Sequence, residues 1–177
     1  MNRSLINLRK EREQISINLV CLGNICRSPM AAAVLANKSA DWHAPKLLVD
    51  SAGTGAWHIG QGPHPSSKKI WEKAGYRYSH IAKKFSINDF FLHDLILVMD
   101  SSNYHNVISM ADNQEKRAKV NYLRSFDPAL KHIDPSSADF YKLEVPDPYN
   151  QSDAAYEETL AMIELAVDGL LQELKNL

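Results

Sequence analysis

The chain has 177 residues, of which 45% are hydrophobic and 23% are charged, and its 20 basic residues nearly balance 21 acidic ones. This composition is typical of a single compact domain with a buried core, and the mixed charges give no reason to expect a nucleic-acid partner. The two cysteines lie close together in the sequence, which excludes a disulfide scaffold and favours a reducing compartment.

The first segment of the chain, residues 1–14, is charged and contains no apolar run long enough for a secretory signal. We expect it to be an extension outside a single domain of residues 15–177. The most apolar window, residues 90–99, is interrupted by His93 and Asp94 and is far shorter than the ~20 residues that a membrane-spanning helix needs. We therefore expect a cytoplasmic protein.

A strand, a loop and a helix are predicted at the start of this domain. Residues 15–22 are β-branched and apolar, which favours a strand, and the Gly-Asn pair that follows favours a turn. Ser28 is a good N-cap residue and Pro29 suits the first helical position, so we expect a helix to begin directly behind the loop.

The rest of the chain alternates strands with helices. Strands are expected at residues 47–53, 95–100 and 119–123, and helices at residues 63–75, at residues 101–111 with Ser101 or Ser102 as the cap, and from near Ser152 onward. The last helix is the most regular, because its apolar residues are three and four positions apart: Leu160, Ile163, Val167, Leu170 and Leu174. This order predicts an α/β fold with a parallel sheet, helices on both faces, and a ligand at the carboxyl ends of the strands.

The loop VCLGNICRSP, residues 20–29, has the pattern of a phosphate-binding site. Backbone N–H groups between a strand and a helix bind anions, and the helix dipole adds positive potential at the same point. Cys21 would ionise more readily in that field, and a thiolate is the nucleophilic form of cysteine. Arg27 can bind two oxygens of the phosphate with its planar guanidinium.

A cysteine and an arginine at this spacing are, on their own, more often a buried strand residue and a surface residue. Gly23, Asn24, the Ser-Pro helix start and the preceding strand together favour the catalytic interpretation. Asn24 tolerates a left-handed conformation or ties the loop through its amide, and Ser28 can hydrogen-bond a thiolate as well as cap the helix.

The stretch CLGNICRSP resembles the signature loop of the low-molecular-weight protein tyrosine phosphatases. The chain is similar to that family, in the family's order, at SAGTGAW (51–57), VMDSSN (98–103), SFDP (125–128) and DPY (147–149). This resemblance covers nearly all of residues 15–177 and implies a flavodoxin-like three-layer sandwich with a four-stranded parallel sheet. It also implies hydrolysis of phosphotyrosine, an aryl phosphate monoester, through a phosphocysteine intermediate and without a cofactor.

The resemblance implies three catalytic roles. Cys21 is the nucleophile, Arg27 clamps the phosphate, and Asp147 is the general acid that protonates the leaving phenol and then activates water. Pro146 and Pro148 flank Asp147 and stiffen the backbone, so the carboxylate is presented at little ordering cost.

Other matching residues shape the site. Trp57 and Tyr149 correspond to aromatic residues that line the substrate slot and stack on a phenyl ring. Cys26 matches a neighbour that can form a reversible disulfide with Cys21 and so protect it from irreversible oxidation. The remaining loop residues are expected as aliphatic walls, Leu22 and Ile25, and as loop supports, Gly23, Asn24 and Ser28.

Two features within the domain depart from the family pattern. Asn150 stands where many members have a second tyrosine, so regulation through that tyrosine is absent. Residues 132–142 look like an insertion that could reshape the rim of the slot, within an irregular segment, residues 125–151, that is long enough to indicate a functional loop. Asp100 and Asn103 match a family feature whose role the sequence does not reveal.

Three other functions stay open on the sequence. Phosphoarginine phosphatases that resemble this family carry threonine where this chain has Ile25, and an aliphatic wall suits an aromatic ring better than a guanidinium. Arsenate reductases of the same fold need further cysteines, and none follows Cys26. A non-catalytic phosphate-binding module would have no use for both Cys21 and Asp147.

The expected partners are phosphotyrosine proteins, an autophosphorylating tyrosine kinase among them, and neither nucleic acid nor a membrane. No metal site is expected, because the histidines show no tight ligand pairing. We interpret them as ordinary surface or partly buried residues: His43, His58, His64, His80, His93, His105 and His132.

Overall fold

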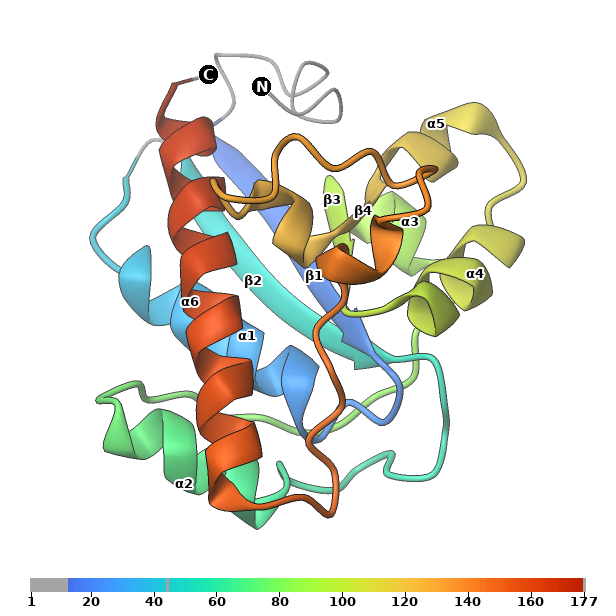
Figure 1. Ribbon diagram of the computed structural model, residues 1–177. Coiled ribbons are helices and arrows are strands. Elements are labelled where there is room, and N and C mark those ends of the chain that lie inside the picture. Colours follow the sequence, from blue (N-terminus) through green and yellow to red (C-terminus); the bar gives the residue numbers. More distant parts are fainter. Residues whose placement is uncertain (1–12, 44, 177) are drawn as a thin grey trace.

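Four parallel strands form the centre of the molecule. The computed structural model describes residues 13–43 and 45–176. The strands are β1 (Gln14–Cys21), β2 (Lys46–Gly53), β3 (Leu95–Val98) and β4 (Val120–Tyr122), in the order β2-β1-β3-β4 (Figure 1). All four lie where the sequence predicts a strand. Most of the predicted extension, residues 1–12, lies outside the described residues, and β1 already begins at Gln14.

Helices connect the strands and cover the sheet. The α-helices are α1 (Arg27–Lys38), α2 (Pro65–Lys73), α3 (Asp89–Leu92), α4 (Ser101–Ser109), α5 (Gln114–Ala118) and α6 (Asp153–Lys175), and the 3-10 helices are η2 (Leu123–Phe126) and η3 (Phe140–Leu143). The sequence pattern predicts α1, α2, α4 and α6 but not the short helices, which span too few residues to show a period. None of the helices in the described ranges is long and apolar enough to cross a membrane.

Apolar side chains cover both faces of the sheet, which produces the three layers of the predicted flavodoxin-like sandwich. Alternate residues of β1 point to opposite faces. Ile17 and Leu19 belong to a buried cluster with residues of α1 and α6, whereas Val20 belongs to a second cluster with residues of α3 and α4. In Figure 1, α6 and α1 lie to the left of the sheet and α4 and α5 to its right.

The longest helix, α6, buries the five apolar residues whose spacing predicts it. Full burial of one such side chain contributes about 1.5–3 kcal/mol, so this face supplies much of the stability on its side of the sheet. Gly169 lies on the same helix, and a Cβ there would be 1.9 Å from the carbonyl oxygen of Phe126. Only glycine therefore lets α6 approach η2 this closely.

The predicted N-cap of the first helix is wrong. α1 begins at Arg27, and no side chain caps its N-terminus. The hydroxyl of Ser28 lies instead against the sulfur of Cys21 and the amide of Asn24. N-cap preference describes only the local backbone, whereas this hydroxyl has partners outside its own helix.

The predicted N-cap of α4 is also wrong. Ser101 and Ser102 lie inside the helix, and Asp100 occupies the cap position. Its Oδ1 accepts a hydrogen bond of 2.8 Å from the N–H of Asn103, which satisfies one of the free N–H groups of the first turn.

Candidate active site

The loop between β1 and α1 lies at the carboxyl edge of the sheet. It is held beside the end of β2, because Thr54 donates its N–H to the carbonyl of Cys21 at 2.9 Å and Gly55 donates to Leu22 at 2.8 Å. A Cβ on Gly53 would lie 2.8 Å from the Leu22 carbonyl oxygen. A glycine at the end of β2 is therefore needed for this close approach.

Asn24 fixes the shape of the loop. It has a φ of 55°, the left-handed conformation predicted for it. Its Nδ2 donates to the hydroxyls of Ser28 at 2.8 Å and Ser51 at 3.0 Å, and its Oδ1 accepts from the Lys83 N–H at 2.9 Å. Its side-chain amide is thus fully used, and its backbone carbonyl accepts a hydrogen bond of 2.6 Å from Nε2 of His80.

The sequence pattern does not single out His80, which comes from a segment far along the chain. Burial lowers the pKa of His80 below its usual value, so the ring is neutral at neutral pH and Nε2 carries its hydrogen. His80 and His93 are both buried, which corrects the interpretation of all seven histidines as surface or partly buried residues. The partner of His80 lies 56 positions away, so no local sequence signal indicates it.

The sulfur of Cys21 is surrounded by hydrogen-bond donors at the N-terminus of α1. The Asn24 N–H donates to Sγ at 3.3 Å, and the Ser28 hydroxyl oxygen lies 3.0 Å from it. The Ser28 oxygen accepts from Asn24, and its own hydrogen has two acceptors within reach, the sulfur at 3.0 Å and the carbonyl of Ala52 at 3.4 Å, of which the sulfur is nearer. Together with the positive end of the helix, these donors stabilise a thiolate.

Cys26 has a different environment from Cys21. Burial raises the pKa of Cys26 to about 12, so it is a neutral thiol at neutral pH. Its Sγ lies 3.9 Å from the hydroxyl of Tyr156, which in turn lies 3.2 Å from Nδ1 of His64. Both cysteines are unpaired thiols. Of the two, only Cys21 has the surroundings of a nucleophile.

Arg27 is almost fully buried and is held by two carboxylates. Its Nη1 donates to Oδ2 of Asp100 at 2.5 Å and to the carbonyl of Val145 at 3.0 Å, and its Nη2 donates to Oδ2 of Asp147 at 2.8 Å. Burial by itself would lower the pKa of Arg27, but Cys21 and these two aspartates raise it above its usual value. Its Nε is buried without a partner among the described residues, which leaves one N–H of the guanidinium unused.

These contacts explain the role of Asp100, which the sequence does not reveal. One oxygen of its carboxylate anchors Arg27 and the other caps α4. Asn103 is fully buried, and its N–H bonds to this cap, but neither polar atom of its side chain has a partner in the described structure. The structure gives that side chain no further role.

Asp147 lies at the mouth of the site on an extended segment. This segment continues beside β3, because Val145 donates its N–H to the carbonyl of Met99 at 2.7 Å. The Asp147 side chain is 39% exposed, and besides Arg27 it accepts from the N–H of Tyr149 at 3.2 Å. The carboxylate therefore faces both the buried guanidinium and the solvent.

A pocket of about 130 Å³ brings most of the predicted site residues together. It is lined by Cys21, Leu22, Gly23, Ile25, Cys26, Trp57, His58, Asp147 and Tyr149. The other three predicted residues, Asn24, Arg27 and Ser28, are buried and contact residues of this wall. His58 also lines the pocket, although the sequence analysis does not single it out. The one signal in the sequence is that His58 directly follows Trp57.

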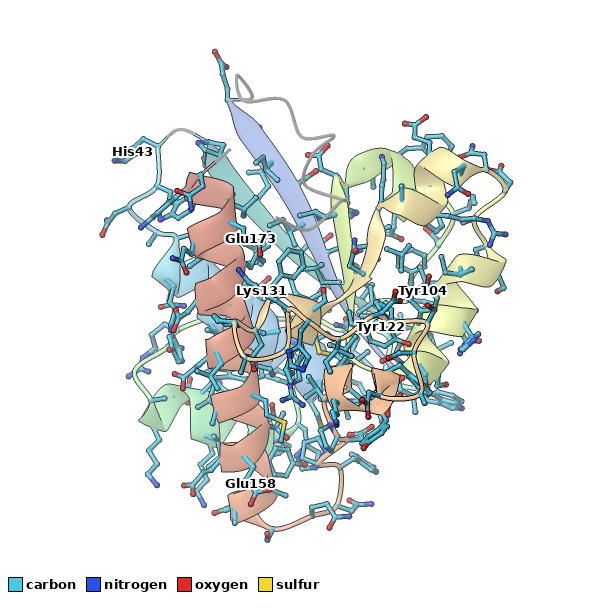
Figure 2. All side chains as sticks on the ribbon, turned by 45° about the horizontal axis from the view of Figure 1, so that its top comes forward. His43, Tyr104, Tyr122, Lys131, Glu158 and Glu173 are labelled. Carbon is cyan, nitrogen blue, oxygen red and sulfur yellow. The ribbon has the colours of Figure 1, made fainter. Side chains whose placement is uncertain are left out.

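The suspected insertion lies elsewhere. No residue of 132–142 lines this pocket in the described part of the chain. Residues 131–135 instead line a separate cavity of about 600 Å³ with Tyr104 and Tyr122, whose rings stack at 5.3 Å. Figure 2 shows these two rings, and it also shows Lys131 beside Glu173 of α6, an ion pair of 2.7 Å.

Three residues outside the pocket have side-chain atoms within 4.8 Å of one another and could hold a metal ion: Asp50, Asp89 and His93. Their polar atoms already bond within the protein. Asp50 pairs with Lys83 and lies 3.3 Å from Nε2 of His93, and His93 donates its Nδ1–H to the Asp89 carbonyl at 2.9 Å. Each of the three residues thus already has a partner within the protein, and both ring nitrogens of His93 lie against protein oxygens.

Comparisons with known proteins agree with this geometry. The model of the low molecular weight phosphotyrosine protein phosphatase family matches residues 16–177. A low molecular weight protein-tyrosine-phosphatase of Streptomyces coelicolor is 39% identical over 158 residues, which cover 89% of this chain and 92% of the relative. A low molecular weight phosphotyrosine protein phosphatase of Schizosaccharomyces pombe is 46% identical over 110 residues, 61% of this chain and 70% of the relative.

The same fold occurs in solved phosphatase structures. A crystal structure of a protein tyrosine phosphatase from Entamoeba histolytica superposes with a TM-score of 0.80 at 29% identity, covering 92% of this chain and 97% of that one.

Proposed function

The chain belongs to the low molecular weight phosphotyrosine protein phosphatase family. We propose that it hydrolyses phosphotyrosine through a covalent phosphocysteine intermediate on Cys21. The observation that carries this mechanism is that Cys21 and Asp147 line one small pocket and that Arg27 is buried directly behind its wall, bonded to Asp147. A nucleophile, an anion clamp and an acid are the three groups that the reaction needs.

In the first step, the Cys21 thiolate attacks the phosphorus of the bound phosphotyrosine. An S–P bond forms, the bond between phosphorus and the phenol oxygen breaks, and Asp147 gives its proton to that oxygen. The loop N–H groups and Arg27 stabilise the charge on the phosphoryl oxygens. The unpartnered Nε of Arg27 supports this role, since it leaves the guanidinium one N–H that no protein acceptor uses.

In the second step, a water molecule attacks the phosphocysteine. An O–P bond forms, the S–P bond breaks, and the ionised Asp147 takes the proton from water. Inorganic phosphate leaves and the Cys21 thiolate is restored. The Ser28 hydroxyl, 3.0 Å from Sγ, stabilises this leaving thiolate.

We propose that the substrate is phosphotyrosine in proteins and that the enzyme acts in the cytoplasm. An autophosphorylating tyrosine kinase is one proposed source of this substrate. Ile25 supports tyrosine over phosphoarginine, because its aliphatic side chain lines the pocket and offers a guanidinium no acceptor. Trp57 and Tyr149 supply aromatic faces at the same pocket. We also propose Cys26 as the partner of an oxidised Cys21, since both thiols line this pocket.

The mechanism is tested with Cys21→Ser. This variant is expected to lose hydrolysis of p-nitrophenyl phosphate and still bind inorganic phosphate in calorimetry, because the loop amides and Arg27 are retained. Turnover by Cys21→Ser at the wild-type rate would remove Cys21 as the nucleophile.

A further inference from the structure

A group of large apolar side chains stands exposed around the mouth of the pocket. We call it the apolar rim; its members and their exposed fractions are Leu22 (40%), Trp57 (70%), Ile59 (57%), Ile81 (65%) and Tyr149 (45%). Leu22, Trp57 and Tyr149 line the pocket itself, whereas the two isoleucines lie outside it. Neighbouring exposed apolar side chains of this size commonly mark an interaction surface.

Ile59 belongs to a segment that packs on the phosphate-binding loop. The residue before it, His58, lines the pocket, and its ring is close enough to Gly23 that a Cβ there would lie 3.1 Å from Cδ2 of the histidine. Ile59 thus follows directly on a residue of the pocket wall, and its side chain remains in the solvent.

Ile81 belongs to a second segment against the same loop. The residue before it, His80, donates to the Asn24 carbonyl at 2.6 Å. The residue after it, Ala82, pairs through its backbone with the first segment. In that pairing the Gly60 N–H donates to Ala82 at 2.8 Å. Ile59 and Ile81 are therefore exposed residues on two segments that are bonded to each other and that both contact the phosphate-binding loop.

The charges near the mouth disfavour an acidic substrate segment. The nine residues that line the pocket include no lysine or arginine, and Asp147 is the one carboxylate among them. Arg27 is buried below; on the segment of Ile81, Lys83 is paired with Asp50, and Lys84 lines a different pocket with Ser86 and Met110. An acidic residue beside the phosphotyrosine would meet the Asp147 carboxylate and apolar side chains, with no cation of the pocket wall to offset its loss of water.

We propose that the apolar rim binds the polypeptide on either side of the phosphotyrosine and selects substrates with aliphatic or aromatic residues within two positions of it. This inference rests on the proposed function. Apolar neighbours of the phosphotyrosine would cover Ile59 and Ile81, and this burial favours binding in the ground state and the transition state alike. The preference therefore shows in KM more than in kcat.

The test uses the full chain and three phosphotyrosine peptides that differ only at the two residues on each side of the phosphotyrosine: leucine, serine or glutamate. The variants are Ile59→Ser, Ile81→Ser and the double variant. The matched control is Leu92→Ser, which removes an equally exposed apolar side chain at the opposite edge of the sheet, near the start of β1. p-Nitrophenyl phosphate, which is too small to reach Ile59 or Ile81 outside the pocket, reports the chemistry alone.

Wild type and Leu92→Ser should hydrolyse the leucine peptide with the highest kcat/KM and the glutamate peptide with the lowest. Each rim substitution should lower kcat/KM on the leucine peptide about fivefold, as expected for partial burial of one isoleucine, and leave the aryl phosphate rate unchanged. Equal kcat/KM of the wild type on all three peptides, or an unchanged rate of the double variant on the leucine peptide, would overturn the inference while the proposed function stands. A wild type that cannot hydrolyse p-nitrophenyl phosphate would overturn both.

Discussion

Asp100→Asn is predicted to slow catalysis while leaving the fold intact. Oδ2 of Asp100 lies 2.5 Å from Nη1 of Arg27, and Arg27 is 2% exposed against 21% for the Asp100 side chain. A hydrogen bond to a charged group contributes about 1.5–3 kcal/mol, and the partial exposure of Asp100 places this one near the lower end. If that free energy is lost from the positioning of Arg27, kcat/KM falls about 10- to 30-fold.

Two substitutions separate catalysis from stability at this position. An asparagine keeps an oxygen for the Asn103 N–H and so retains the cap of α4, whereas Asp100→Ala removes it and costs about 1 kcal/mol of unfolding free energy. Both variants should lose similar kcat/KM on p-nitrophenyl phosphate, and only the alanine variant should unfold at clearly lower urea. If Asp100→Asn keeps wild-type kcat/KM, then Asp100 does not position Arg27 and the reasoning is refuted.

Three further substitutions test the site and the core. Asp147→Ala should slow hydrolysis of aryl phosphates with poor leaving groups by about 10²- to 10⁴-fold, and an unchanged rate on such a substrate would place the acid elsewhere. Ile25→Thr should shift the ratio of kcat/KM values from phosphotyrosine toward phosphoarginine, and an unaltered ratio would remove the argument that Ile25 selects tyrosine. Gly169→Ala should lower the unfolding free energy by about 1–3 kcal/mol in urea titration, because its Cβ would overlap the Phe126 carbonyl; stability equal to wild type would mean that α6 and η2 can separate freely.

The architecture could be predicted because its signals are local. The apolar run of β1, the Gly-Asn turn and the regular spacing on α6 each lie within one segment, and the alternation of strands and helices then limits the topology. The left-handed conformation of Asn24 was predictable for the same reason, since few residues other than glycine adopt it.

The contacts that complete the site could not be predicted, because they join distant segments. Ser28 is a good N-cap by local preference, but its hydroxyl lies against Cys21 and Asn24. Asp100 holds Arg27 across 73 positions of sequence, and His80 reaches Asn24 across 56. No periodicity or cap rule refers to such partners, and only the folded chain brings them together.

The central claim is that Cys21, and not Cys26, carries the phosphoryl group during turnover. It is tested most directly by acid-quenching the wild type during rapid turnover of p-nitrophenyl phosphate and locating the phosphoryl group by mass spectrometry. The phosphoryl group is expected on Cys21. A phosphoryl group on Cys26 would contradict the account. So would turnover that shows no phosphoenzyme at the earliest quench times, together with an aryl phosphate rate that Cys21→Ser leaves unchanged.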